Sequence, residues 1–256
     1  MPGWREPAHV AEEAAAGRRG RVEKIDFSST VRPGAKAALH VYFPAGYDAS
    51  IARHPVAYVL DGDAAQEKGL VPRSLDHLMP DTVAPALVVF LGRFDWGASK
   101  PKPEEEPKVA LELLVKEVVP LVDARFRTAA EPAARAVVGH FFGAQVALRA
   151  AFDDAGLFGA LGLQSAAMLD TDEVELYLLL RPAADRPLRV YHDWGRYDAH
   201  ATREHWDMRT TNARLNARLR EKGYQPAGGE APDGVGWGSW RNRTDRLFAV
   251  LFPPRG

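Results

Sequence analysis

The sequence predicts an α/β fold built on a mostly parallel central sheet with helices on both faces. From Arg21 onward, short apolar runs alternate with stretches of helical period, as is typical of strands joined by crossover helices. Two of the runs, Pro55 to Leu60 and Ala86 to Leu91, are almost continuously apolar, which favours strands covered on both faces. A third run leads through two glycines, Gly139 and Gly143, straight into a helix of small residues.

Composition limits the classes of protein to which the chain can belong. Its 256 residues, 46% hydrophobic and 26% charged, suffice to bury one substantial core. We expect one domain at residues 21–256 behind an N-terminal extension at residues 1–20. The formal net charge is −1 with both signs interspersed, so the whole chain has no electrostatic footprint for nucleic acid or an anionic membrane. The absence of cysteine excludes disulfides, zinc-thiolate sites and thiol catalysis.

The N-terminal sequence lacks the apolar core of a signal peptide, and no stretch reaches the length of a membrane span. We therefore expect a cytoplasmic, soluble protein with no cofactor, no metal, and no nucleic-acid or membrane partner. A small-molecule or peptide ligand and a homo-oligomer are left open.

The first half of the chain begins with an extension that we expect to be loose or helical. Val22 to Phe27 and Ala38 to Phe43 predict two early strands, with an antiparallel pairing left open, and the turn at Pro44 to Asp48 follows them. Between the two continuously apolar strands, Ser74 to Met79 predicts part of a crossover helix.

A long loop is predicted next. Gly92 to Pro107 has neither a helical nor a strand period. We favour a solvated connection over a substrate lid here, because only some long loops are functional. Val109 to Val122 then has the pattern of an amphipathic helix, which Pro120 bends or ends.

The second half continues the alternation. Ala134 to Val138 predicts a short strand, and Ala144 to Phe152 predicts the helix after the glycine-flanked turn. Further strands are predicted at Leu157 to Leu163 and Leu188 to His192, and further helices at Asp172 to Leu180, Thr210 to Lys222 and Trp237 to Phe252. Gly223 is a suitable residue to end the second of these helices.

Several short strings occur in a characteristic order, namely Val41 to Asp48, Val59 to Gly62, Glu117 to Pro120, Val138 to His140, Gln164 to Ser165, Gly195 to Asp198 and Trp237 to Arg241. In this order and spacing, the chain resembles the putative-esterase family (enterochelin-esterase-like, esterase D-like) from about Gly20 to Pro253. The resemblance implies an α/β-hydrolase fold and a Ser-His-Asp triad.

The turn departs from the family at the nucleophile. The family's elbow reads G-x-S-x-G, in which glycines let the backbone turn tightly while the serine is lifted above the sheet. Gly139 and Gly143 match this pattern, but Phe141 stands in the serine position. Phenylalanine has no nucleophilic atom, so no acyl-enzyme can form there.

The general base is also absent. The family carries a histidine two residues before the first tryptophan of a W-x-x-W-R string, and alignment on Trp237 places Val235 there. No histidine follows His205. The triad acid maps onto Asp198, with Asp193 as a nearby alternative. Without a histidine, this carboxylate has no imidazole to orient.

The resemblance also implies a pocket above the carboxyl ends of the strands. Nine candidate residues for its lining are Gly62, Asp63, Trp96, His140, Phe141, Phe142, Asp198, Val235 and Trp237. In the family the oxyanion-hole amides come from positions that match Phe142 and the Gly62-Asp63 loop, and such backbone donors persist whatever the side chains are. We favour a His140 packed under the turn over a catalytic one.

Other polar and aromatic residues receive structural interpretations. The densest group of potential metal or acid-base side chains consists of His192, Asp193, Asp198, His200 and His205. Their spacing matches no metal motif, so we interpret the group as a polar loop at a strand end. Asp61-Gly62-Asp63 is interpreted as a strand-end turn and Ser165 as a structural serine. The tryptophans interpreted as core or pocket wall are Trp194, Trp206, Trp237 and Trp240.

Three functions compete. The favoured one is a non-hydrolytic pseudoenzyme that binds a small molecule, peptide or protein, because Phe141 and Val235 replace both proton-transfer groups of the triad. The second is an isomerase, epimerase or lyase that uses the pocket and the surviving amides, with His140 or the substrate's own carboxylate as the proton-transfer group. The third is an esterase with a relocated triad, for which the sequence offers no convincing serine-histidine pair.

Overall fold

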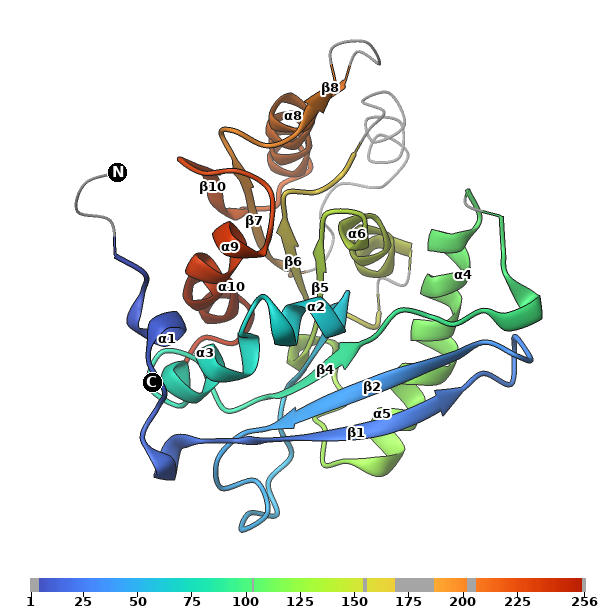
Figure 1. The fold of residues 1–256 in the computed structure, drawn as a ribbon, viewed down its shortest axis with the longest axis vertical. Helices are drawn as coiled ribbons and strands as arrows, with labels where there is room; N and C mark the ends of the chain where they lie inside the picture. Colours follow the sequence, from blue (N-terminus) through green and yellow to red (C-terminus); the bar gives the residue numbers. More distant parts are fainter. Residues whose placement is uncertain (1–4, 103, 154–155, 169–186, 202–205, 255–256) are drawn as a thin grey trace.

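The central sheet of the computed structural model has eight strands among the described residues, which are 5–102, 104–153, 156–168, 187–201 and 206–254 (Figure 1). In sheet order they are β1 (Arg21–Ser28), β2 (Lys36–Phe43), β4 (Leu87–Leu91), β3 (Val56–Leu60), β5 (Arg135–His140), β6 (Ala160–Gln164), β7 (Arg189–Gly195) and β10 (Ala227–Ala231). The β1-β2-β4 pairs are antiparallel, and every pair from β4 to β10 is parallel. The predicted α/β fold is confirmed.

The strands differ in burial according to their position in the sheet. At the edge, β1 alternates between buried and exposed residues over its second half, with Ile25 and Phe27 facing the core. In the middle, every residue of β3, β4, β5 and β6 is buried. This is the pattern that continuous apolar runs predict for strands covered on both faces.

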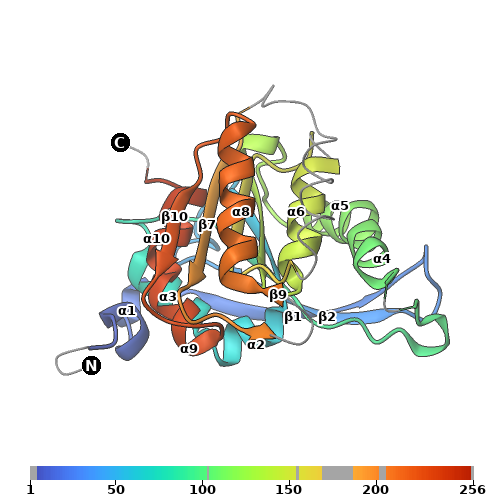
Figure 2. The ribbon, with the colours of Figure 1, turned by 90° about the horizontal axis from the view of Figure 1, so that it is seen from above.

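Helices cover the sheet on both faces, as Figure 2 shows. One core contains Tyr58 of β3 together with residues of α4 (Glu106–Leu113), α5 (Val119–Arg125), α6 (Gly143–Asp153) and α8 (Met208–Glu221). The opposite core contains Val59 of β3 together with residues of α2 (Gly62–Glu67), α3 (Val71–Leu78) and α10 (Thr244–Leu251). Successive residues of a strand point to opposite faces, so each buried strand contributes to both cores.

The predicted helix at Val109 to Val122 lies within a longer helical stretch. It consists of α4, a π-helical turn at Leu114–Val118 and α5. The Val119 amide bonds to the Leu114 carbonyl, five residues back, just before Pro120. Proline has no amide hydrogen to continue the regular pattern, so the irregular turn absorbs the break that the sequence predicted.

The C-terminal part contains predicted helices and one sheet strand, β10, that the sequence did not predict. Asp207 caps α8 by accepting a hydrogen bond from the Arg209 amide, and Gly223 follows the helix with a left-handed φ of 94°. The predicted helix at residues 237–252 is divided into α9 (Trp237–Trp240), a 3₁₀ turn at Arg241–Arg243, and α10. The short strands β8 (His200–Ala201) and β9 (Trp206–Asp207) pair separately. The helix predicted at residues 172–180 lies outside the described residues.

The N-terminal segment from residue 5 onward packs along α3 and includes α1 (Ala8–Ala11) and a 3₁₀ turn at Ala16–Arg18. Val10 is buried. The Arg18 guanidinium donates to the His77 and Met79 carbonyls at 2.9 and 2.8 Å. The segment is therefore tied to the domain, and of the two expected alternatives, loose or helical, these residues include the helical turns. None of the described helices is both long and apolar enough to span a membrane.

Candidate functional site

A tight turn joins β5 to α6 at the carboxyl end of the sheet. Phe141 occupies it with a φ of 50°, in the left-handed region that non-glycine residues rarely adopt. A Cβ atom at Gly139 would lie 2.4 Å from the Gly143 carbonyl oxygen, so the strand and the helix can approach this closely only with glycine there. The predicted strand-turn-helix is confirmed, and its apex carries a phenyl ring.

A pocket of about 640 Å³ opens beside this turn, and we call it the elbow pocket. Its lining consists of Leu60, Asp61, Leu91, Gly92, Arg93, Phe94, Trp96, Glu106, Pro107, Ala110, Phe141, Phe142, Gly143, Gln145 and Val146. The Phe142 side chain is about half exposed, and its amide donates to no acceptor among the described residues. A backbone donor is therefore free at the turn.

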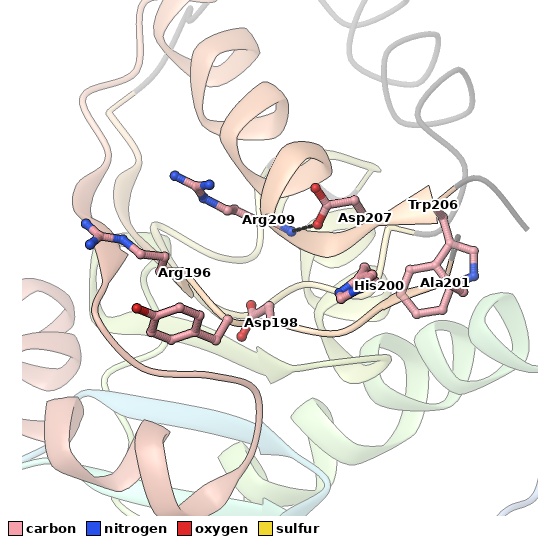
Figure 3. A pocket seen from close by; sticks show the side chains of 8 residues that line it. Arg196, Asp198, His200, Ala201, Trp206, Asp207 and Arg209 are labelled. Atoms are coloured by element: carbon pink, nitrogen blue, oxygen red, sulfur yellow. Dashed lines mark hydrogen bonds between the residues drawn. The ribbon is translucent and has the colours of Figure 1, made fainter. Parts of the chain in front are cut away.

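Asp198 lies on the other side of the turn, in the loop after β7. Figure 3 shows its side chain next to that of His200 at a second pocket of about 630 Å³, which Tyr197 also lines. Both of its carboxylate oxygens are buried, and neither has a hydrogen-bond partner among the described residues. Burial raises the pKa of this carboxyl, although the nearby Ser165 hydroxyl favours the ionised form. Asp198 is thus a buried acid that forms no ion pair with a described cation.

Val235 lies in the loop between β10 and α9, with 37% of its surface exposed. The position that a Cβ would take at Gly195 is 2.5 Å from Asp198 Oδ1 and 2.7 Å from the Gly234 Cα atom. The loop that carries Val235 therefore passes beside the buried carboxyl of Asp198. A valine offers that carboxyl no hydrogen-bond donor.

His140 lies beneath the turn and does not line the elbow pocket. Its ring is buried, with Nε2 3.1 Å from Gln164 Oε1 and its centroid 4.4 Å from that of Trp237. Burial lowers its pKa to about 4, so the ring is neutral at physiological pH. His140 is therefore a packed residue, as favoured from the sequence, and it lies outside the described lining of the elbow pocket.

Gln164 connects His140 to a buried polar network. Its Nε2 donates to Asp193 Oδ2 at 3.1 Å, and the Tyr191 hydroxyl donates to the same oxygen at 2.5 Å. The Arg243 guanidinium, from the 3₁₀ turn before α10, reaches this oxygen at 2.7 Å. Asp193 is therefore a buried, ion-paired structural residue.

Only some of the residues predicted to line one pocket share a pocket in the structure. Trp96, Phe141 and Phe142 line the elbow pocket, whereas Asp198 lines the second one. The remaining candidates Gly62, Asp63, Val235 and Trp237 are absent from both linings. A Cβ at Gly62 would meet the Leu91 amide nitrogen at 2.5 Å, so this residue packs tightly against β4. The Asp63 carboxyl is directed to His40, 3.7 Å away.

The loop after β4 is largely exposed over its described residues, as expected for a solvated connection. Trp96 is the exception that matters for the site, because it is buried, stacks on Phe94 and forms part of the pocket wall. Asp61 was discussed only as part of a turn, and Arg93 and Phe94 were missed. All three follow the ends of β3 and β4, at the same edge of the sheet as the elbow. That position was the available signal, because ligands of open α/β sheets bind outside the carboxyl ends of the strands.

The other sequence-predicted groups have structural partners. His192 is buried and lies 2.9 Å from Asn212 Oδ1, and Ser165 accepts a hydrogen bond from Trp240 Nε1 at 2.9 Å. No three histidine, aspartate or glutamate side chains among the described residues converge as metal ligands. His205 lies outside those residues. Trp194 and Trp240 are core residues, and Trp206 is a wall of the second pocket, as interpreted from the sequence.

The parallel sheet, its two helical layers and the strand-turn-helix at Phe141 define an α/β-hydrolase fold. The chain belongs to the esterase family described as "Putative esterase", whose sequence profile matches residues 30–250. Among curated protein sequences, none matches this chain.

Solved structures agree with this fold. The ferric enterobactin esterase of Salmonella typhimurium superposes with a TM-score of 0.76 at 20% identity, over 98% of this chain and 62% of that one. A ferulic acid esterase superposes with a TM-score of 0.72 at 18% identity, over 91% and 98% of the two chains. The ferulic acid esterase of Anaeromyces mucronatus gives 0.72 at 16% identity, over 96% and 97%. At such identities the similarity establishes the fold alone. The chain spans less than two thirds of the Salmonella protein.

Proposed function

We propose that this chain is a non-hydrolytic member of the esterase family, a pseudoenzyme that uses the elbow pocket to bind a small molecule, a peptide or a protein partner. The observation that carries the proposal is that Phe141 occupies the turn while the buried Asp198 carboxyl forms no ion pair with a described histidine or other cation and has, among the described residues, only the Ser165 hydroxyl near it as a side-chain hydrogen-bonding group. In a working triad the acid orients a histidine and the histidine activates a serine. Here both of those positions are apolar.

The lining of the elbow pocket supports the same proposal. Its described residues include no serine, threonine, cysteine, lysine or histidine. An esterase with a relocated triad needs a hydroxyl or thiol beside a base at the substrate. The buried Ser165, which accepts a bond from Trp240, does not line the pocket.

A second candidate function is a non-hydrolytic enzyme such as an isomerase, epimerase or lyase. One observation favours it: the Asp61 carboxyl lines the elbow pocket, and the atoms that crowd it raise its pKa. Perturbed carboxyls in pockets are typical of acid-base catalysts. His140, which we had considered for this role, is sealed beneath the turn.

The proposal is tested by incubating the native chain with p-nitrophenyl acetate and butyrate and with a fluorophosphonate probe. We expect no turnover above the buffer rate and no labelled serine, because none of the described residues that line the elbow pocket carries a hydroxyl. The Phe141→Ser/Val235→His variant serves as the comparison, since it returns a nucleophile to the turn and a histidine beside Asp198. Hydrolysis by the native chain that disappears on Ser165→Ala or another serine substitution would overturn the proposal.

A further inference from the structure

Four aromatic rings form a large part of the wall of the elbow pocket. Phe94 and Trp96 follow β4 and stack with centroids 4.8 Å apart and an interplanar angle of 26°. Phe141 and Phe142 meet edge to face across 4.5 Å at 71°. The face of an aromatic ring carries negative charge density, so rings grouped around one space favour a cation there.

The described lining of this pocket carries more negative than positive charge. Asp61 and Glu106 line it with carboxylates, and Arg93 is the single cation among its described lining residues. Glu106 accepts a hydrogen bond from Trp96 Nε1 at 3.1 Å, which holds this carboxylate against the aromatic wall. Asp63, two residues further along, adds another negative charge near Asp61.

The Asp61 carboxyl is the charged group of this lining that stands nearest the turn. It is exposed to solvent, and it makes no hydrogen bond or ion pair with a described residue, although its backbone starts α2. Its Oδ2 lies 3.2 Å from the position that a Cβ would take at Gly143, so it stands directly beside the turn. Crowding raises its pKa, as does Asp63, while Arg93 lowers it only in part. A ligand that brings positive charge to Asp61 would stabilise its ionised form.

We propose that the elbow pocket binds an organic ammonium ion whose nitrogen donates a hydrogen bond to Asp61 and whose apolar part packs on the four rings. This inference rests on the proposed binding function, because it takes the pocket as a ligand site. A ligand carboxylate is disfavoured, since it would face both Asp61 and Glu106. Arg93 and Asp61 are both exposed, so solvent and salt screen both charges; the two carboxylates and the one guanidinium leave the described lining with a net negative charge.

The test compares three probes of similar size by isothermal titration calorimetry at pH 7.5: 2-phenylethylammonium, 3-phenylpropanoate and the neutral 3-phenylpropanamide. We expect saturable binding of the ammonium ion at least tenfold tighter than that of either other probe. Tighter or equal binding of the carboxylate, or no saturation by the ammonium ion at millimolar concentrations, overturns the proposal.

Asp61→Asn removes the charge while keeping a residue type that tolerates the left-handed backbone, here at a φ of 56°. We expect this substitution to weaken ammonium binding at least tenfold and to leave the affinity for 3-phenylpropanamide unchanged. The matched control is Asp26→Asn, which removes a carboxylate from an exposed pair with Lys24. Thermal unfolding establishes that each variant is folded. Glu106→Gln keeps a hydrogen-bond acceptor for Trp96 while removing the second carboxylate, so its ammonium affinity tests the role of negative charge independently.

Unchanged ammonium affinity in both Asp61→Asn and Glu106→Gln also overturns the proposal. The two proposals fail separately. Ester hydrolysis by the native chain would remove the pseudoenzyme proposal while ammonium selectivity stands. Selectivity for the carboxylate probe without hydrolysis would remove only the ammonium proposal.

Discussion

Replacing Arg243 with methionine removes the cation from a buried ion pair. The Arg243 side chain is 7% exposed and that of Asp193 is 2% exposed, and their Nε and Oδ2 atoms lie 2.7 Å apart. Arg243 also pairs with Asp233. The variant would leave Asp193 ionised in the core, with only the Tyr191 hydroxyl and the Gln164 amide as donors. Removing one partner of a buried pair costs about 3–5 kcal/mol, and the two remaining donors favour the lower figure.

The measurement is urea unfolding at pH 7.5, followed by tryptophan fluorescence and far-ultraviolet circular dichroism. Arg196→Met is the matched control, because this arginine is 52% exposed and pairs with Glu230 at the surface. We expect a loss of at most about 1 kcal/mol in the free energy of unfolding for the control. The double variant Arg243→Met/Asp193→Asn should lose less than the two single losses combined. A loss below about 1 kcal/mol for Arg243→Met, or equal losses in Arg243→Met and Arg196→Met, would refute the reasoning.

Two further predictions concern residues around the elbow. The folded pKa of His140 is about 4, below the usual value of 6.5, so the unfolded chain is protonated first as the pH falls. The contribution of His140 to stability is complete above about pH 6.5 and is lost toward pH 4 at about 1.4 kcal/mol per pH unit. The unfolding free energy of His140→Gln, plotted against pH, should therefore be flatter over this range than that of the native chain. Native and variant curves that run parallel from about pH 6.5 to about pH 4 would contradict the assignment. Gly139→Ala should prevent native folding or cost more than about 3 kcal/mol, because the new methyl group meets the Gly143 backbone. Gly238→Ala, which has open space in α9, should be neutral in the same thermal melts; equal effects of the two substitutions would show that the close approach is not the cause.

Local pattern was sufficient for the elements that depend on neighbouring residues. The apolar runs that became β3 and β4 predicted buried parallel strands because a strand covered on both faces has no polar side. The glycine pair around Phe141 predicted the tight turn because the close approach excludes a Cβ at Gly139. Gly223 likewise predicted the end of α8 through its left-handed backbone.

Elements that depend on distant partners were not visible. β10 reads Ala-Gly-Gly-Glu-Ala, which has no strand propensity, and it forms by pairing with β7. In the loop after β4, no local pattern shows that the Trp96 ring stacks on Phe94 beside the elbow. Charge compensation is equally non-local: Asp193 and Asp198 lie five positions apart, yet only Asp193 meets Arg243.

The sequence by itself determined the fold class, the turn, and the presence of phenylalanine and valine at positions 141 and 235, because these follow from side-chain chemistry and short-range backbone geometry. Only the tertiary structure decided that Phe141 and Asp198 line different pockets, that His140 is sealed beneath the turn, and that Asp61 lines the elbow pocket. Those outcomes depend on which carboxyl ends of strands meet and on which atoms fill the space between them. Packing of residues far apart in the chain settles both.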